Sequence, residues 1–321
     1  MKRIIFLALV TILISFSSSF SQINVGSKEY VTLKPGKIEQ SDLDALKASK
    51  TYFVYRPSDD VEELKKAISE VWKFTEITFI PYDDIDNIPA QNASIFALTG
   101  YNKQVYSTVK TNNTKVYLSL WMEIKNKKGK TKKITFCRIE FHPIFKDLEH
   151  ITSLNTENEI GYLYNQGTLN NWNTGFLKNY LKNVNDRLQD GTNRWLYKSE
   201  SNHAELKNLA KETLYIPDYL LVKFNKFDGD ESEKLDKVEL FEKYPFKYEI
   251  LSAKELSEKI ISEEKPFYYL VYVKSSTDVY FTIFNSKTGE IIYSSYKSMS
   301  YNASSSDFKS ITSGIKSQLE K

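Results

Sequence analysis

The chain has 321 residues, with 44 Lys and Arg against 41 Asp and Glu, three His and one Cys. A hydrophobic fraction of 41% and a charged fraction of 26% are typical of a folded globular protein and exclude a disordered or fibrous chain. The single cysteine excludes an internal disulfide framework and a cysteine-rich zinc module. The net charge of +3 is too small to indicate a nucleic acid as partner.

Residues 1–21 have the pattern of a secretory signal peptide. Residues 2 and 3 are basic, residues 4–14 are apolar, and small residues suit cleavage before Gln22. Its end, Ser-Phe-Ser-Gln, resembles the signal peptides of proteins secreted by Gram-negative bacteria. We expect an exported protein, periplasmic or extracellular, that is not a lipoprotein because no cysteine lies near the cleavage site. The alternative is an uncleaved anchor, for which the apolar run is short.

Cleavage leaves 300 residues and, without the two basic residues of the signal, 42 basic against 41 acidic side chains. A chain of this length predicts about two domains. We expect a first α/β unit with an N-terminal extension (22–151), an Asn-rich loop and helical connector (152–212), and a second α/β unit (213–321). No later segment is apolar enough to span a membrane, so no transmembrane segment is expected after cleavage.

The first unit begins with an apolar strand at 52–55 and a helix at 61–72, for which Asp59 and Glu62 suggest a capping box. Further strands are expected at 76–80, 94–98, 115–125 and 133–141, the last two as a hairpin.

The connector begins with a stretch rich in Asn, Thr and Gly, residues 152–175, which is typical of a loop. An amphipathic helix follows at 175–189, and a shorter helix at 204–212. Because its apolar face needs burial, we expect the longer helix to pack on one or both units and to fix them into one body.

The second unit is expected to begin with a strand at 219–224, followed by the acidic segment 228–233 and a helix. A strand at 248–251 precedes a helix that Ser252 and Glu255 cap. The strand 267–273, a hairpin of strands 279–284 and 290–296, and a last helix containing residues 308–319 complete the chain.

Both units therefore have the order β-α-β-(α)-β-β-β. Residues 76–85 align with 247–256, and residues 115–120 align with 278–283 in apolar pattern. We predict a mixed α/β fold of two tandem, duplicated units with mixed sheets, although a similar order can also arise by chance. The order resembles periplasmic domains of the curli-secretion and TolB-like type in topology only. It carries no residue motif, so no function or site is transferred.

The Asn-rich loop contains the first candidate binding residues, Trp172 with Asn171 and Asn173. An exposed Trp beside amide side chains can stack on a sugar or enter a pocket of a protein partner. The alternative is that Trp172 is a hydrophobic plug beneath the helix that follows.

The acidic segment contains a candidate calcium site. Asp228, Asp230, Ser232 and Glu239 occupy positions 1, 3, 5 and 12 of a calcium-binding loop. Glu233 stands where that loop needs glycine, and a strand precedes it in place of a helix. The alternative is that the acidic side chains stabilise the start of a helix.

No phosphate-binding loop, nucleophile elbow or His-Glu-x-x-His motif is present, so we predict no cofactor and no catalytic residue. The lone Cys137 is expected to be a buried small apolar residue, with an exposed thiol as the alternative. The sequence favours an exported non-catalytic protein that binds a protein or a cell-envelope component such as a polysaccharide, and not nucleic acid. The alternative is an exported carboxylate-based hydrolase acting on glycan or another envelope polymer.

Overall fold

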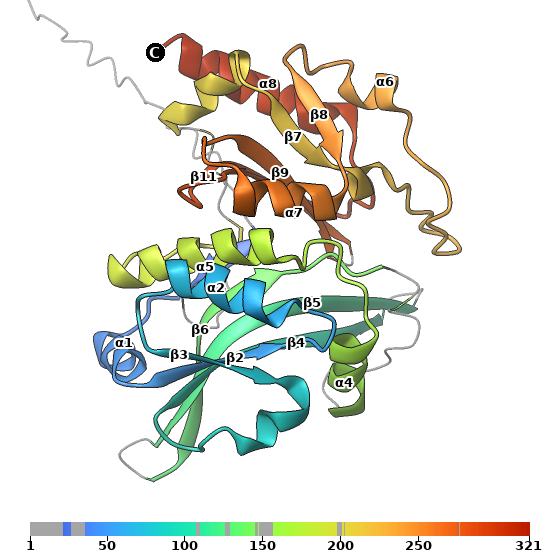
Figure 1. The fold of residues 1–321 in the computed structure, drawn as a ribbon. Coiled ribbons are helices and arrows are strands. Elements are labelled where there is room, and N and C mark those ends of the chain that lie inside the picture. The colour runs from blue at the N-terminus through green and yellow to red at the C-terminus, as the bar shows by residue number, and fades with distance from the viewer. Residues whose placement is uncertain are drawn as a thin grey trace, which may run out of the picture.

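The computed structural model describes residues 22–26, 36–106, 110–125, 129–144, 147, 157–197, 201, 203–275 and 277–321. The predicted signal peptide lies outside the described residues. The described chain forms two mixed sheets with helices between and beside them, which confirms the mixed α/β class (Figure 1). Among the described helices, none combines the length and apolar character that crossing a membrane requires.

The first sheet has six strands in the order β1-β6-β5-β4-β2-β3. Strand β2 pairs in parallel with β3 and β4, whereas β4, β5, β6 and β1 are joined by antiparallel pairs. The strands are β1 (Ile23–Val25), β2 (Lys50–Tyr55), β3 (Ile77–Pro81), β4 (Ala93–Tyr106), β5 (Lys110–Lys125) and β6 (Thr131–Glu140). The helices of this unit are α1 (Gln40–Lys47), α2 (Val61–Val71), the 3-10 helix η1 (Tyr82–Asn87), α4 (Glu157–Asn165) and α5 (Thr174–Gln189).

The second sheet has five strands in the order β11-β10-β9-β7-β8. Strand β7 pairs in parallel with β8 and β9, and β9, β10 and β11 are antiparallel. The strands are β7 (Leu214–Pro217), β8 (Tyr248–Leu251), β9 (Tyr268–Ser275), β10 (Asp278–Asn285) and β11 (Ile291–Ser298). The helices are η2 (Ala204–Ala210), η3 (Asp218–Leu221), α6 (Lys237–Phe241), α7 (Ala253–Ser262) and α8 (Ser305–Leu319), of which η2 and η3 are 3-10 helices.

Strands β2–β6 and β7–β11 thus have the same order and the same relative directions, with β1 added to the first sheet. The alignment of residues 76–85 with 247–256 makes Ile77 equivalent to Tyr248. Following the strand pairings from there makes Lys115 equivalent to Asp278, which is the second alignment seen in the sequence. The strand pairings of each sheet therefore relate the first sequence alignment to the second. An origin by duplication stays a prediction.

Helix α5 lies between the two sheets, together with α2 and α7 (Figure 1). On its second-sheet side Phe176 stacks on Tyr269 with ring centroids 5.7 Å apart. At its start the Gly175 amide donates to the Ser257 hydroxyl of α7 over 2.9 Å. A single cluster of buried apolar side chains includes residues of both sheets and of α5, so the connector helix packs on both units.

The opposite face of the second sheet is covered by η2, α6 and α8, through side chains such as Leu206, Leu240 and Phe308. Every residue of β9 and β10 is buried as a result. The aromatic strand β9 is therefore covered on both faces, as expected for a sheet with helices on each side.

The sequence prediction contains no element at β1 or α1, and four further elements differ from it. The predicted strand at 219–224 is the 3-10 helix η3 and a loop, while the true strand is β7, whose four residues end at Pro217 because proline cannot continue the ladder. Helix α4 lies inside the predicted loop, α6 has only five residues, and the helix at 204–212 is 3-10. The N-cap of α2 is Asp60 and not Asp59, whereas the capping box of Ser252 is confirmed.

Candidate functional site

Trp172 is buried, with 6% of its surface exposed, so of the two sequence interpretations the exposed contact residue is excluded. Its ring packs against Phe141, with centroids 5.1 Å apart, and against Phe53 of β2. The indole nitrogen donates a hydrogen bond of 2.9 Å to the Asp59 carboxylate. Trp172 therefore fills the space beneath the start of α5, as the alternative prediction of a hydrophobic plug describes.

Asn171 and Asn173 hold this loop in place. The fully buried Asn171 accepts a hydrogen bond of 2.7 Å from the His142 amide, and its side-chain nitrogen donates to the Glu140 carbonyl oxygen over 3.2 Å. Asn173, at the N-cap position of α5, is half-buried and donates to the Asn170 carbonyl oxygen over 3.3 Å. The structure brings the three predicted residues together, but as the inside of a packed loop and not as a surface.

Asp59 and Arg56 complete this filled edge, where β2 ends. Burial raises the pKa of Asp59, although hydrogen bonds from the Arg56 amide and the Trp172 indole act in the opposite direction. The Arg56 guanidinium donates to the carbonyl oxygens of Tyr164 and Gly167. A carboxyl group with a raised pKa suits a general acid, but both Asp59 oxygens are already engaged. The hydrolase alternative stays a prediction.

The predicted calcium ligands lie on exposed chain. The Asp228 carboxylate accepts from the Asn225 side chain and the Asp230 amide, and the Asp230 carboxylate accepts from the amide and hydroxyl of Ser232. Glu239 lies in the first turn of α6, where its amide donates to Asp236. Within the described ranges, no group of three or more His, Cys, Asp or Glu side chains is arranged to hold a metal ion. The acidic side chains organise the loop that precedes α6.

A buried network of charges connects the two sheets. Lys115 of β5 forms an ion pair with Asp278 of β10, whose other oxygen accepts a hydrogen bond of 2.8 Å from the Tyr296 hydroxyl. Burial opposes the charged form of Lys115, but the carboxylates of Glu140 and Asp278 outweigh it and raise the pKa of Lys115. Glu140 pairs with Arg138 and accepts from Ser275 of the second sheet over 3.0 Å. This network therefore fixes the contact between the units.

An open pocket of about 400 Å³ lies at one edge of the second sheet. Strands β7 and β9 are parallel, and β11 runs in the same direction, so their carboxyl ends share this edge. The pocket lies between the loop that follows β7 and η3 and the loop that follows β11. In open α/β sheets, ligands bind at the edge formed by the carboxyl ends of the parallel strands. Its lining residues are Lys223, Phe224, Asn225, Lys226, Phe227, Asp230, Glu233, Tyr301 and Asn302.

Aromatic rings and a cation form the mouth of this pocket. Phe224 and Tyr301 stack with centroids 6.0 Å apart and planes 19° apart. The Lys226 ammonium nitrogen lies 5.1 Å from the centroid of the Phe227 ring and 5.9 Å from that of Tyr301. Phe227 is 88% exposed and offers its ring to a ligand in the pocket.

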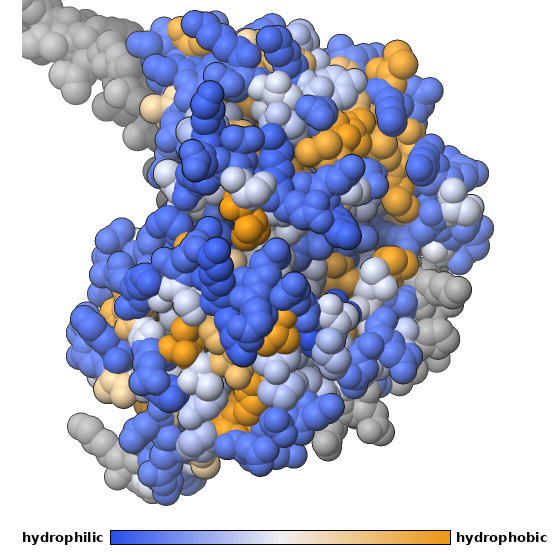
Figure 2. Space-filling view, in the orientation of Figure 1, coloured by the Kyte–Doolittle hydropathy of each residue, from blue (hydrophilic) through white to orange (hydrophobic). Residues whose placement is uncertain are grey.

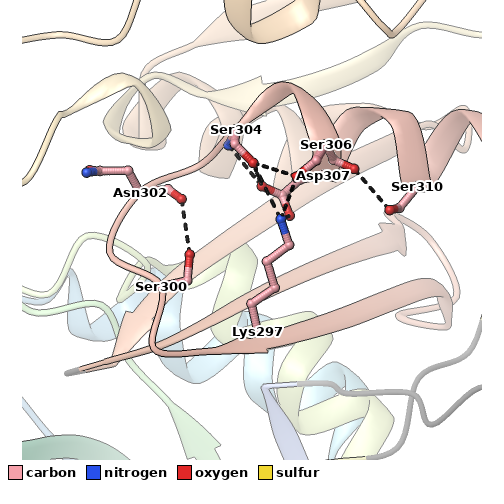
Figure 3. Close-up of polar contacts among 7 residues, drawn as sticks. All are labelled: Lys297, Ser300, Asn302, Ser304, Ser306, Asp307 and Ser310. Carbon is pink, nitrogen blue, oxygen red and sulfur yellow. Dashed lines mark hydrogen bonds and ion pairs between the residues drawn. The ribbon is translucent and has the colours of Figure 1, made fainter.

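The loop after β11 is held by hydrogen bonds and by the start of α8 (Figure 3). The Asn302 side chain accepts from the Phe224 amide over 2.7 Å and donates to the Phe224 carbonyl oxygen over 2.9 Å, which ties the two loops together. Ser304 and Asp307 form a capping box, and Lys297 of β11 pairs with Asp307. The pocket is thus built on a fixed frame.

A larger hollow of about 540 Å³ lies between α1 and the ends of α2 and α5, lined among others by Leu43, Phe74 and Leu188. Helix α1 leads into β2, and α2 ends beside the start of β3. This hollow therefore lies at the amino edge of the parallel strands, opposite to the edge that binds ligands in such sheets.

The sequence prediction missed the pocket. Phe224 was placed inside a strand, and Tyr301 is far away in the chain. The available signal was the segment Lys-Phe-Asn-Lys-Phe at 223–227, in which two cations and two phenyl rings precede a turn at Gly229, with a φ of 76°.

Comparison of the chain with protein-family models, with curated proteins and with solved structures finds no match. The resemblance in topology to periplasmic domains therefore stays a prediction.

Proposed function

We propose that this chain is an exported, non-catalytic binding protein whose second unit takes a cell-envelope component in the pocket at its carboxyl edge. One observation carries the proposal. The same edge is filled by Trp172 and Asp59 in the first unit, but in the second unit it is open and presents an uncovered phenyl ring, Phe227.

The pattern of residues 1–21 supports the exported location of this binding activity. We expect the full chain, fused to a reporter enzyme that is active only outside the cytoplasm, to give activity, and the mature protein to begin at Gln22. Activity confined to the cytoplasm would contradict export.

Binding is tested with the mature chain, residues 22–321, in co-sedimentation with Gram-negative cell walls and outer membranes. Phe227→Ala is the test variant because its exposure lets the ring be removed without disturbing the core. Val238→Ala is the matched control, since Val238 is 82% exposed on α6 and does not line the pocket. Figure 2 shows apolar residues gathered over the second unit near α6 and β8.

We expect wild type and the Val238 variant to sediment alike, and the Phe227 variant to bind at least about tenfold more weakly, as for an aromatic contact residue. Equal sedimentation of all three proteins, or no sedimentation of wild type, would refute the proposal.

A further inference from the structure

The geometry points to an acidic saccharide as the ligand of this pocket, with Lys226 pairing with the carboxylate of a uronic acid and Phe227 packing against a face of the sugar ring. This inference rests on the proposed function and names the class of ligand.

The three lysines near the pocket differ in their partners. Lys223 forms an ion pair of 2.5 Å with Glu233, and Lys274 of β9 forms one of 2.5 Å with Glu231. Lys226 has no carboxylate partner among the described residues and contacts only aromatic rings. One positive charge is therefore left for a ligand, and a carboxylate is the group that completes its pairing.

The rings beside Lys226 fit the body of a sugar. Sugar rings carry C–H groups on their faces, and these groups pack on the electron-rich face of an aromatic ring. Phe227 offers such a face to solvent. Tyr301 lines the same pocket, and its hydroxyl has no hydrogen-bond partner among the described residues, so it is available to a sugar hydroxyl.

The charged residues of the lining favour a ligand that places one carboxylate, and not several charges, in the pocket. The two lysines, Lys223 and Lys226, and the two acids, Asp230 and Glu233, sum to zero, but Glu233 pairs with Lys223 and leaves the ammonium of Lys226 as the local positive charge. A phosphate-rich ligand such as a nucleic acid needs several unpaired cations, whereas a uronate needs one. A uronic-acid glycan has both groups that the pocket requires: hydroxyl groups that can bond to the polar lining residues, and a carboxylate that can pair with Lys226.

The test uses pairs of ligands that differ only in charge. Hexamers of glucuronate, galacturonate and mannuronate are each compared, by titration calorimetry with the mature chain, with the same hexamer after its carboxylates have been reduced to primary alcohols. The variants are Lys226→Gln and Phe227→Ala. Lys309→Gln is the control, because Lys309 is exposed on α8 and does not line the pocket.

We expect at least one uronate hexamer to bind, and Lys226→Gln to weaken that binding roughly tenfold, as for a partly exposed charge-assisted hydrogen bond. The same variant should leave binding of the reduced hexamer unchanged. Phe227→Ala should weaken binding of both ligands, the control variant should behave as wild type, and affinity for the uronate should fall as salt is added.

Failure of this inference is distinguishable from failure of the proposed function. Envelope binding that depends on Phe227, combined with no preference for any uronate hexamer over its reduced form, would overturn the acidic saccharide and leave the binding protein in place. Absence of binding to all the hexamers would also overturn it. Binding to envelope material that does not depend on Phe227 would refute both the proposed function and the acidic-saccharide inference.

Discussion

Replacing Trp172 with alanine tests whether this residue supports the fold or contacts a ligand. The indole is 6% exposed and packs on Phe53 and Phe141. Truncation of a buried Trp costs about 3–5 kcal/mol of unfolding free energy, and removing the indole donor from the half-buried Asp59 carboxyl costs about 1 kcal/mol more. We expect a loss of at least about 4 kcal/mol, a large part of the stability of an ordinary domain.

Trp172→Phe separates the ring from its hydrogen bond. Phenylalanine keeps much of the packing but cannot donate to Asp59, so we expect a loss of about 1–3 kcal/mol. The indole hydrogen bond is one of the influences that lower the pKa of Asp59, whose net pKa is already raised by burial. Removing it raises this pKa further, and because the charged form is the one left unsupported, the variant should lose more stability at neutral pH than in acid.

The assays are urea unfolding, which gives the free energy of unfolding, and an NMR titration of the Asp59 carboxyl carbon. An alanine variant within about 1 kcal/mol of wild type, with an unchanged denaturant slope, would refute the packing argument. If that stable variant also failed to bind envelope material, Trp172 would be a ligand contact after all.

Three further predictions concern the inside of the molecule. Gly175→Ala places a methyl group 2.6 Å from the Ser257 carbonyl oxygen, so calorimetry should show a loss of about 1–3 kcal/mol as α5 and α7 separate. Burial, with the nearby charge of Lys274, holds the pKa of His142 well below its ordinary value, so folded protein binds fewer protons and stability falls as the pH drops below about 6.5. His142→Gln should flatten that loss in urea titrations between pH 7 and 5. Burial raises the pKa of Cys137 to about 12, so a thiol reagent should react with it in urea and not with the folded chain.

Much of the fold could be predicted because its signals are local. Apolar runs between turn residues placed nine of the strands, and the capping box at Ser252 placed the start of α7. The short strand β7 carries too few residues for a periodic pattern. Its apolar neighbours Tyr219–Leu221 gave the stronger signal, although they form a buried 3-10 turn. Which of two adjacent apolar segments joins the sheet is decided by pairing with β8 and β9, which no local pattern contains.

The candidate site depended on contacts between distant residues. An Asn-rich loop is usually exposed, but Asn171 is buried because its amide satisfies the backbone where β6 ends, at the Glu140 carbonyl oxygen and the His142 amide. The pocket needs Phe224 and Tyr301, which meet only because β7 and β11 run in the same direction. Nothing in the sequence around either residue indicates this contact.

The two units offer a comparison within one molecule, because the same strand order ends in two different edges. The residue before the N-cap of the last helix is Trp172 in the first unit and Ala303 in the second. In the first unit, the Trp172 ring and its hydrogen bond to Asp59 fill the carboxyl edge of the sheet. In the second unit, the small side chain of Ala303 leaves this edge unfilled, and only the connecting loops line it. Function on such folds lies in the connecting loops and not in the shared strands. Substitutions at the two edges should therefore affect different properties. Changing Trp172 should lower stability, and changing Phe227 should lower binding alone. A Phe227 variant that loses stability in step with binding would mean that the ring supports its loop, and the second edge would then lose its claim to a ligand.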